Sequence, residues 1–373
     1  MLNNILLTGK GRCNFTTAKP VSEIVAAFSK KGKFLYSALT KFSNTDLISF
    51  FEKRGIKTKV ERGQRMFPVS DQAQTILSCL LKELRINKVK ILFKARVLKI
   101  KKPANFFTLF LDNKSEIEAD KVIIATGGKS YPQTGSSGDG YRFAKDLGHK
   151  IISPKPALAS LICRNKRIRN LAGLSLKNVK LTFKANNKML LSIFGEMLFT
   201  HLGVSGPMVL ISSKAVYNSI SKKEKVEALI DLKPALDKVK LKKRIYRDIH
   251  KSPKKEFQSL LKELLPKKLI YFTHTKLEID KKRLNSSLTA KEVDSLVTFL
   301  KEFSFTIDAV SPLSTAIITN GGVEIDQINS QTMESNIVPN LFFSGEIIAL
   351  DGPTGGYNLQ KAFSTGYLAG NSV

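Results

Sequence analysis

Residues 341–362, LFFSGEIIALDGPTGGYNLQKA, decide the fold. Their pattern predicts a short buried strand, an acidic segment with Glu346 and Asp351, and then a helix that a pair of glycines opens. Backbone N–H groups at such a helix N-terminus form an anion site. Carboxylates that follow a strand of a dinucleotide-binding fold accept hydrogen bonds from sugar hydroxyls. This stretch therefore predicts an α/β fold that binds a ligand at the carboxyl end of a strand.

A second glycine cluster follows another expected strand. Residues 121–125, KVIIA, are short, apolar and β-branched, as in a strand that is buried on both faces. Thr126, Gly127 and Gly128 come next and lead through a glycine-rich loop into an expected helix. Open α/β sheets bind ligands at the carboxyl ends of their strands, so this cluster is a second candidate. The alternative is an ordinary strand–loop–helix turn.

Two further clusters are less specific. Residues 8–14, TGKGRCN, combine two glycines that permit close backbone approach with Arg12, whose planar cation suits a phosphate. Many ordinary loops share this combination. Residues 195–207, GEMLFTHLGVSGP, place His201 in an expected loop, where it is the candidate acid or base. The alternative for His201 is a structural histidine held by hydrogen bonds, and no other catalytic residue is predicted.

The character of the sequence changes twice along the chain. Residues 1–152 and 305–373 have the glycine-rich, β-branched texture of an α/β domain. Two prolines follow residue 152, and residues 153–234 alternate in short β-like runs. Residues 235–304 are rich in Lys and Leu and have a helical pattern. Similar outer segments around a different middle predict a discontinuous α/β domain with a long insertion.

The charge of the chain is its one unusual global property. The 373 residues include 61 Lys and Arg against 31 Asp and Glu, which gives a net charge of +30. Such a field attracts polyanions such as nucleic acid, acidic membranes or phosphorylated ligands. The basic residues are spread in short groups, and the sequence has no RNA-binding signature with interleaved aromatics. The favoured expectation is a lysine-rich surface without specific nucleic-acid binding.

The remaining global features concern location and metals. No apolar run approaches the roughly 20 residues that cross a bilayer, and no secretory signal opens the chain. Cys13, Cys79 and Cys163 are too few and too scattered for a disulfide framework or a zinc site. The sequence therefore predicts a cytoplasmic protein with no metal site and no membrane span.

Together the motifs resemble those of the BaiN/YhiN-like family of NAD(P)/FAD-dependent oxidoreductases. The matching strings occur in the family's order across nearly the whole chain. They are GRCN, MFPVSDQAQ, ATGGKSYPQTGSSGDGY, GLSLKNV, GEMLFTHLGVSGP, SPLSTAIITNGGV and FFSGEIIALDGPTGGYNLQKAFSTGYLAG. The resemblance implies a Rossmann-like FAD-binding domain with an inserted β-rich and helical domain. It also implies that NAD(P)H reduces the flavin, which then passes a hydride to an unsaturated or carbonyl small molecule.

The resemblance assigns cofactor-binding residues as well. It places the first cluster near the FAD, the second beside the adenine-side half, and the last along the ribityl chain, pyrophosphate and flavin ring. The residues so implied are Arg12, Cys13, Asn14, Thr126, Gly127, Gly128, Gly345, Glu346, Asp351, Gly355, Gly356, Tyr357, Asn358 and Leu359. Cys13 is expected to be a packed, unreactive thiol, because Arg12 is the only charged neighbour in sequence that could activate it.

The chain departs from the family at its start. Family members begin with a strand, a G-x-G-x-x-G turn, a helix and a second strand that ends in Glu. The expectation is therefore a truncated chain that lacks the first βαβ unit and binds FAD weakly. Two alternatives to a small-molecule reductase remain open. One is a non-catalytic relative that binds RNA through its basic surface, and the other is an RNA-modifying flavoprotein.

Overall fold

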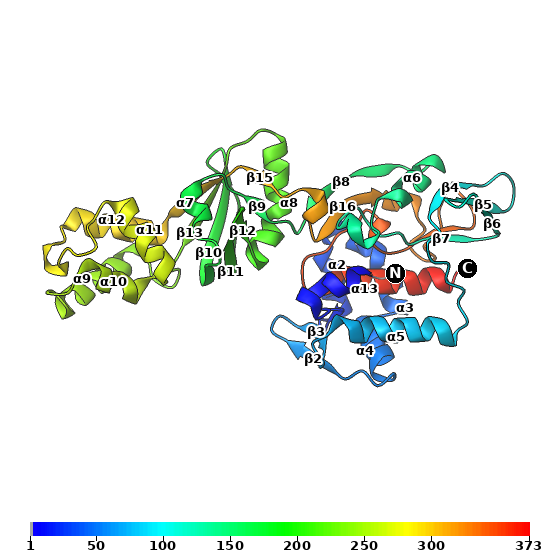
Figure 1. The fold of residues 1–373 in the computed structure, drawn as a ribbon, viewed down its shortest axis with the longest axis horizontal. Coiled ribbons are helices and arrows are strands. Elements are labelled where there is room, and N and C mark those ends of the chain that lie inside the picture. Colours follow the sequence, from blue (N-terminus) through cyan, green and yellow to red (C-terminus); the bar gives the residue numbers. More distant parts are fainter. Residues whose placement is uncertain (1–2) are drawn as a thin grey trace. The chain divides into compact units, whose positions relative to one another are not determined.

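The computed structural model describes residues 3–373, which fold into two compact units (Figure 1). Unit 1 comprises Met1–Ala157 and Pro312–Val373, and unit 2 comprises Leu158–Ser311. In sequence, unit 2 thus interrupts unit 1. Both units mix helices and sheets, so the chain has the mixed α/β architecture that its sequence predicts.

Unit 1 contains the parallel strand pair at the centre of the sequence argument. β7 (Val122–Ile124) and β17 (Leu341–Phe343) pair in parallel, with Leu341 opposite Val122. The two predicted strands therefore lie in one sheet. β17 is fully buried, and α13 (Tyr357–Gly370) follows it and packs beside it.

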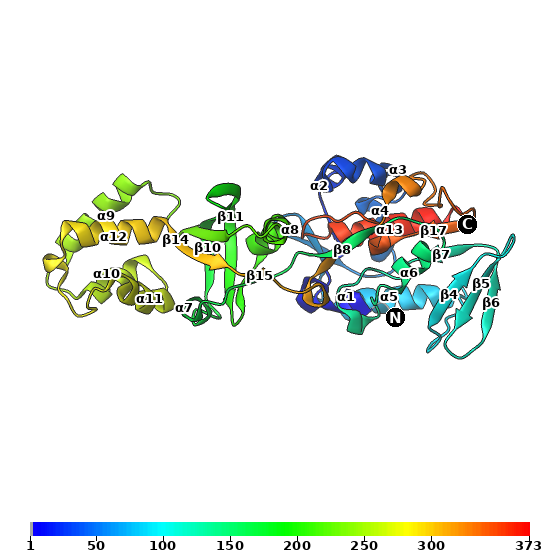
Figure 2. The same cartoon turned by 90° about the horizontal axis from the view of Figure 1, so that it is seen from above.

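Three antiparallel sheets and further helices complete unit 1 (Figure 2). The sheets are ordered β1–β3–β2, β4–β5–β6 and β16–β8. Their strands are β1 (Thr16–Thr17), β2 (Thr58–Glu61), β3 (Arg65–Pro68), β4 (Val97–Lys101), β5 (Phe107–Leu111), β6 (Glu116–Ala119), β8 (Ile151–Ala157) and β16 (Ile318–Val323). The helices are α1 (Asn3–Leu7), α2 (Val21–Ala27), α3 (Tyr36–Lys41), α4 (Asn44–Glu52), α5 (Ala73–Ile86) and α6 (Asp139–Asp146). A capping box between Ser43 and Asp46 opens α4.

Unit 2 is built on one antiparallel sheet of seven strands, ordered β14–β13–β10–β11–β12–β9–β15. The strands are β9 (Leu161–Ile162), β10 (Ser175–Ala185), β11 (Lys188–Thr200), β12 (Gly203–Ser205), β13 (Val226–Asp231), β14 (Phe303–Ile307) and β15 (Ala309–Val310). The helices are α7 (Lys166–Arg169), α8 (Pro207–Ser221), α9 (Lys238–Lys251), α10 (Phe257–Leu264), α11 (Lys267–Leu277) and α12 (Ala290–Lys301). Figures 1 and 2 both show α9–α12 grouped at one end of unit 2.

The boundaries between the units differ by a few residues from those expected. Residues 153–157 belong to unit 1, because β8 continues through both prolines as a partner of β16. β8 is an edge strand, where the missing N–H group of proline is tolerated. Residues 305–311 belong to unit 2, because β14 pairs with β13 and buries Phe303, Phe305 and Ile307 at alternate positions.

β7 has one strand edge that is unpaired. The backbone of β7 pairs with β17 on one side, and no other strand among residues 3–373 pairs with its second side. Ile123 in β7 is 37% exposed, and Phe93 in a separate loop is 71% exposed.

None of the described helices combines the length and the apolar composition that a membrane span requires.

Candidate functional site

Three of the four glycine clusters lie in unit 1, and the structure brings them together. The first cluster, residues 8–14, lies next to the last, residues 341–362, because Gly356 lies directly against the backbone of Thr16, two residues after Asn14. The second meets the last because the Gly128 N–H group donates to the Glu346 carboxylate at 3.3 Å. The loop after β7 is thus hydrogen-bonded to the segment after β17, and the turn before α13 packs against the segment that follows residues 8–14.

Glu346 joins the loop after β7 to β16. One carboxylate oxygen accepts a hydrogen bond from the Thr319 N–H group at 2.8 Å, and the other accepts the bond from Gly128. A Cβ atom on Gly128 would lie 2.5 Å from Thr319 Oγ1 and 2.8 Å from Glu346 Cδ, so only glycine permits this approach. A carboxylate has about four acceptor positions, so Glu346 can accept further bonds from ligand hydroxyls.

The turn before α13 is fixed by its own side chains. The Asn358 side chain accepts from the Gly352 N–H group at 2.9 Å and donates to the Gly352 carbonyl at 2.9 Å. Gly355 and Gly356 have φ values of 120° and 94°, in the region that favours glycine. No side chain caps the N-terminus of α13. Its first N–H groups are therefore available to an anion.

A buried lysine lies behind this turn. Lys361 is 2% exposed, and its Nζ donates to the Leu350 carbonyl at 2.6 Å. Burial lowers the pKa of Lys361 to about 8, although the nearby charges of Glu346 and Asp351 act in the opposite direction. Asp351 in turn accepts a hydrogen bond from the side chain of Asn320. The acidic segment is therefore balanced by one buried cation.

The pKa of Lys361 predicts how stability depends on pH. Its pKa falls from an ordinary 10.5 in the unfolded chain to about 8 in the folded one, so the unfolded chain binds more protons between these values. Stability contributed by this group is therefore present at high pH and lost as the pH falls through 8. As the pH rises from about 7 to 9, we expect the free energy of unfolding of wild type to increase by about 1 kcal/mol more than that of Lys361→Met.

Urea unfolding of both proteins across this range measures the difference. Burial raises the pKa of Cys13 to about 11, so Cys13 contributes a pH dependence of stability with the opposite sign. Both proteins contain Cys13, so this contribution cancels when they are compared. Parallel stability curves for the two proteins would show that Lys361 is not perturbed.

Cys13 and Asn14 are held in a tight turn of the first cluster. Cys13 is fully buried and packs in a core cluster with Phe15 and Phe51, as expected of an unreactive thiol. Asn14 Oδ1 is buried and has no hydrogen-bond partner among the described residues. A buried acceptor without a partner costs free energy, so this atom is a candidate contact for a ligand donor.

Arg12 is engaged within unit 1. Its guanidinium donates to Glu61 at 2.7 Å and to Asp71 at 3.3 Å, and it lies 4.3 Å from the centre of the Phe67 ring. A phosphate would have to compete with both carboxylates. The role of Arg12 in cofactor binding stays a prediction.

His201 lies in unit 2, in the turn between β11 and β12. Its side chain is exposed, and its carbonyl accepts a hydrogen bond from Arg169 Nε at 2.7 Å. No hydrogen bond of its imidazole ring joins it to a described residue. Its acid–base role stays a prediction.

The other predicted residues line the same part of unit 1. Thr126 is exposed, and Gly127 has a φ of 76°. Gly345 donates its N–H group to Thr365 Oγ1 at 3.0 Å. Tyr357 is buried and Leu359 is half-buried in the first turn of α13.

Three residues of this candidate site were not predicted from the sequence. Thr319 and Asn320 in β16 contact Glu346 and Asp351, and Lys361 lies beneath them on α13. The available signal for the first two was the glycine pair that follows them in ITNGG. Lys361 gave no local signal, because a lysine in a helix is normally a surface residue.

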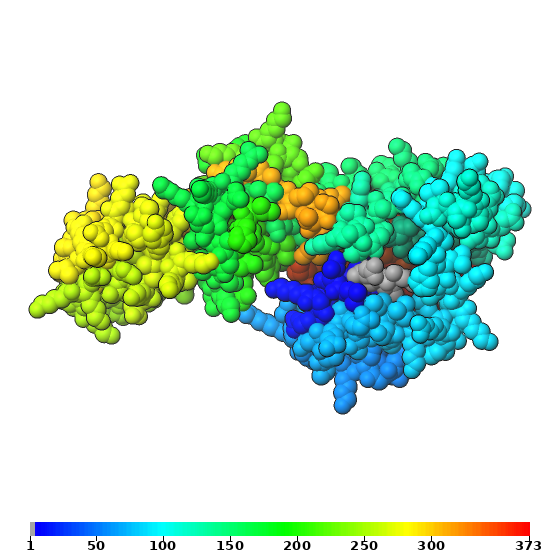
Figure 3. All heavy atoms as spheres, viewed as in Figure 1, coloured from blue at the N-terminus to red at the C-terminus, as the bar shows by residue number. Residues whose placement is uncertain are grey.

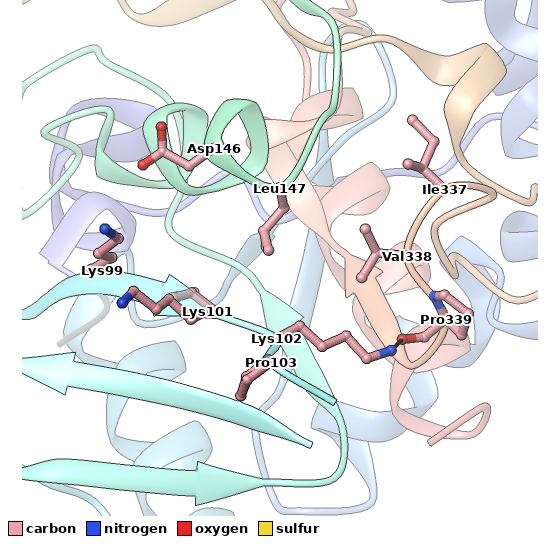
Figure 4. A pocket seen from close by; sticks show the side chains of 10 residues that line it. Lys99, Lys101, Lys102, Pro103, Asp146, Leu147, Ile337, Val338 and Pro339 are labelled. Atoms are coloured by element: carbon pink, nitrogen blue, oxygen red, sulfur yellow. Dashed lines mark hydrogen bonds between the residues drawn. The ribbon is translucent and has the colours of Figure 1, made fainter. Parts of the chain in front are cut away.

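Two pockets on unit 1 lie elsewhere. Figure 4 shows one of about 570 Å³ between the end of β4, the end of α6 and residues 337–339. None of the predicted cofactor residues lines it. Among residues 3–373, no group of three or more His, Cys, Asp or Glu side chains is placed to hold a metal ion.

Parallel strands whose carboxyl ends meet a glycine turn and an uncapped helix N-terminus define a Rossmann-like protein. Residues 1–372 match the family model described as the HI0933-like protein Rossmann domain, and the chain belongs to this family.

Three relatives match 99% of this chain. The chain is 32% identical over 372 residues to the 3-dehydro-bile acid delta(4,6)-reductase of Clostridium scindens, with 89% of that protein covered. It is 32% identical over 377 residues to the ribosomal RNA dihydrouridine synthase of Haemophilus influenzae, with 89% covered. The protein of the same name in Escherichia coli is 30% identical over 372 residues, with 88% covered.

Proposed function

We propose that this protein is a FAD-dependent oxidoreductase. The observation that carries the proposal is the presence in unit 1 of three groups: the uncapped N-terminus of α13, the Glu346 carboxylate, and the unpartnered Asn14 Oδ1, two residues from the Thr16 backbone that Gly356 approaches. These groups suit a pyrophosphate, a polyhydroxyl chain and a ligand N–H or O–H group, respectively. The Rossmann-like family and the reductase name of one relative support a redox reaction.

The chain's own residues would bind and orient the cofactor. The N–H groups of residues 355–359 would hold the pyrophosphate, and Glu346 would accept hydrogen bonds from the ribityl hydroxyls. Residues 126–128 would lie beside the adenine-side half, and Asn14 would accept a hydrogen bond from the cofactor. Bound FAD would supply hydride chemistry, with NAD(P)H as reductant and an electron-poor double bond as acceptor.

The first candidate acceptor is an unsaturated or carbonyl small molecule. The name of the Clostridium scindens relative describes the reduction of carbon–carbon double bonds in a bile acid. Conjugation to a carbonyl makes such a bond electron-poor, so that it accepts a hydride. This acceptor class agrees with the chemistry that the family resemblance implies.

The second candidate acceptor is a uracil base in RNA. Two relatives are named ribosomal RNA dihydrouridine synthases, and this chain carries a net charge of +30. Dihydrouridine is uridine whose ring double bond, conjugated to a carbonyl, has been reduced. The same hydride chemistry therefore serves both candidates, and the basic surface favours the second.

Asn14 offers a test of the cofactor proposal. Replacement by alanine removes a buried acceptor that has no partner, so Asn14→Ala should leave the melting temperature of the cofactor-free protein unchanged or higher. FAD affinity should fall about tenfold, the loss of roughly 1.4 kcal/mol. Flavin fluorescence titration measures the affinity. The exposed Asn218 in unit 2 supplies the control, Asn218→Ala.

Equal FAD affinity in wild type and both variants would remove Asn14 from the site. No saturable FAD binding by wild type would contradict the cofactor proposal itself. Acceptors are then compared by incubating the FAD-loaded protein and NADPH with a steroid enone or with a uridine-containing RNA. Mass spectrometry identifies which product has gained two hydrogens.

A further inference from the structure

The outer face of α9 carries a stripe of positive charge. Lys240, Lys243, Arg247 and Lys251 are exposed and follow one another at intervals of three or four residues. At about 1.5 Å per residue, this spacing places neighbouring charges about 5–6 Å apart along one face. The opposite face of α9 buries Leu241, Ile245 and Ile249 in the core of unit 2, which fixes the orientation of the stripe.

Two loops extend this stripe beyond the end of α9. Their backbones are joined, because Asn285 N–H donates to the Lys255 carbonyl at 2.9 Å and Gln258 N–H donates to the Lys281 carbonyl at 3.0 Å. The Asn285 side chain also donates to the carbonyl of Ser252, directly after the last residue of α9. The joined loops bring together four exposed lysines, Lys254, Lys255, Lys281 and Lys282.

These eight residues, called the α9 basic surface below, are weakly neutralised. Lys240 and Arg247 have carboxylate neighbours, Asp237 and Asp248, at 3.7 and 3.6 Å. The other six have no ion pair with any described residue: Lys243, Lys251, Lys254, Lys255, Lys281 and Lys282. Glu256 and Asp280 are exposed in the same two loops, so positive charge remains in excess.

The surrounding unit adds to this field. Unit 2 contains 31 Lys and Arg against 14 Asp and Glu, a net charge of +17 in fewer than half of the residues. The helical group that carries the α9 basic surface is the yellow-green and yellow lobe in Figure 3. A row of exposed cations along a helix matches a chain of phosphates better than a single phosphate, which needs a concave site.

We propose that the α9 basic surface binds the phosphate backbone of RNA and presents the RNA substrate to this protein. This inference rests on the second candidate function and adds the place where the RNA would be held. A membrane surface fits less well, because a membrane-binding helix inserts its apolar face, whereas that face of α9 is already buried.

The test removes four charges at once. The variant Lys243→Gln/Lys251→Gln/Lys254→Gln/Lys255→Gln should bind a fluorescently labelled RNA hairpin at least about tenfold more weakly than wild type at about 100 mM salt. The slope of its log affinity against log salt concentration should be smaller in magnitude by about 3, because each lost phosphate contact lowers that magnitude by roughly 0.7–0.9. Glutamine suits a helix, so the melting temperature should be unchanged.

The control removes the same charge elsewhere in unit 2. Lys177→Gln/Lys188→Gln/Lys222→Gln/Lys225→Gln alters four exposed lysines outside the helical group and should keep most of the affinity and the slope. Equal losses in both variants would overturn the proposal, since binding would then follow total charge. Binding to phosphatidylserine vesicles without binding to RNA would also overturn it.

FAD affinity is measured in parallel in all three proteins. Unchanged FAD binding with selective loss of RNA binding supports both the surface and the cofactor proposal. Loss of RNA binding in a protein that never binds FAD would leave the surface standing while contradicting the proposed function.

Discussion

Gly356→Ala is expected to destabilise unit 1 by about 3 kcal/mol or more and to abolish FAD binding. The φ of Gly356 is 94°, where a side chain is strained. The added Cβ would also lie 2.3 Å from the Thr16 carbonyl oxygen and 2.4 Å from its carbon. Both are backbone atoms of a neighbouring segment, so no rotamer change relieves the overlap. The N-terminus of α13 would have to move.

Urea unfolding followed by circular dichroism measures this loss, and FAD titration measures the effect on binding. Gly370→Ala is the matched control, because a Cβ on this last residue of α13 meets no atom within 4 Å. Alanine favours a helix over glycine, so the control should be neutral or slightly stabilising. Similar stability of the two variants would show that Thr16 and α13 are not in contact.

Glu346→Ala is expected to cost about 3 kcal/mol of stability, because each buried donor left without its acceptor costs about 1–3 kcal/mol. The change leaves the N–H groups of Gly128 and Thr319 without their acceptor. It also removes one of the two negative charges that act on the buried Lys361. FAD affinity should fall by about 100-fold or more, since both the ligand acceptor and the loop positions are lost.

Glu346→Gln separates charge from shape. The amide keeps one oxygen, so one of the two backbone bonds survives and about half of the stability loss is expected. Glu302→Ala is the control, because this exposed residue pairs with Lys238 at the surface and should change stability little. A Glu346→Ala protein as stable as wild type would contradict the role of Glu346 in joining the loop after β7 to β16.

Local sequence patterns predicted the central residues of the candidate site, whose role in binding stays a prediction. Glu346 and Gly356 were found because an acidic residue after a buried strand and a glycine pair before a helix each have a local cause. Arg12 illustrates the limit of such patterns. Its carboxylate partners Glu61 and Asp71 lie 49 and 59 residues away, and only the folded chain brings them together. The sequence therefore suggested a contact with a phosphate, whereas the structure shows the guanidinium paired with two carboxylates, and the role of Arg12 toward a phosphate stays a prediction.

The boundary between the units and the burial of Lys361 could not be predicted from the sequence either. Pro154 and Pro156 suggested a break, whereas β8 carries both because its pairing with β16 leaves it at an edge. Lys361 lies on a helix that is covered by several elements, and neither its burial nor its bond to Leu350 follows from its neighbours in sequence. The expected absence of a first βαβ unit stays a prediction.

The open edge of β7 has a consequence for handling the protein. An unpaired strand edge with exposed apolar side chains is a template for another chain, and the charge of +30 opposes such encounters by repulsion between copies. The reach of that repulsion falls from about 10 Å at 0.1 M salt to about 3 Å at 1 M. A wash in concentrated salt, the usual means of removing RNA from a basic protein, would therefore promote aggregation of the purified protein.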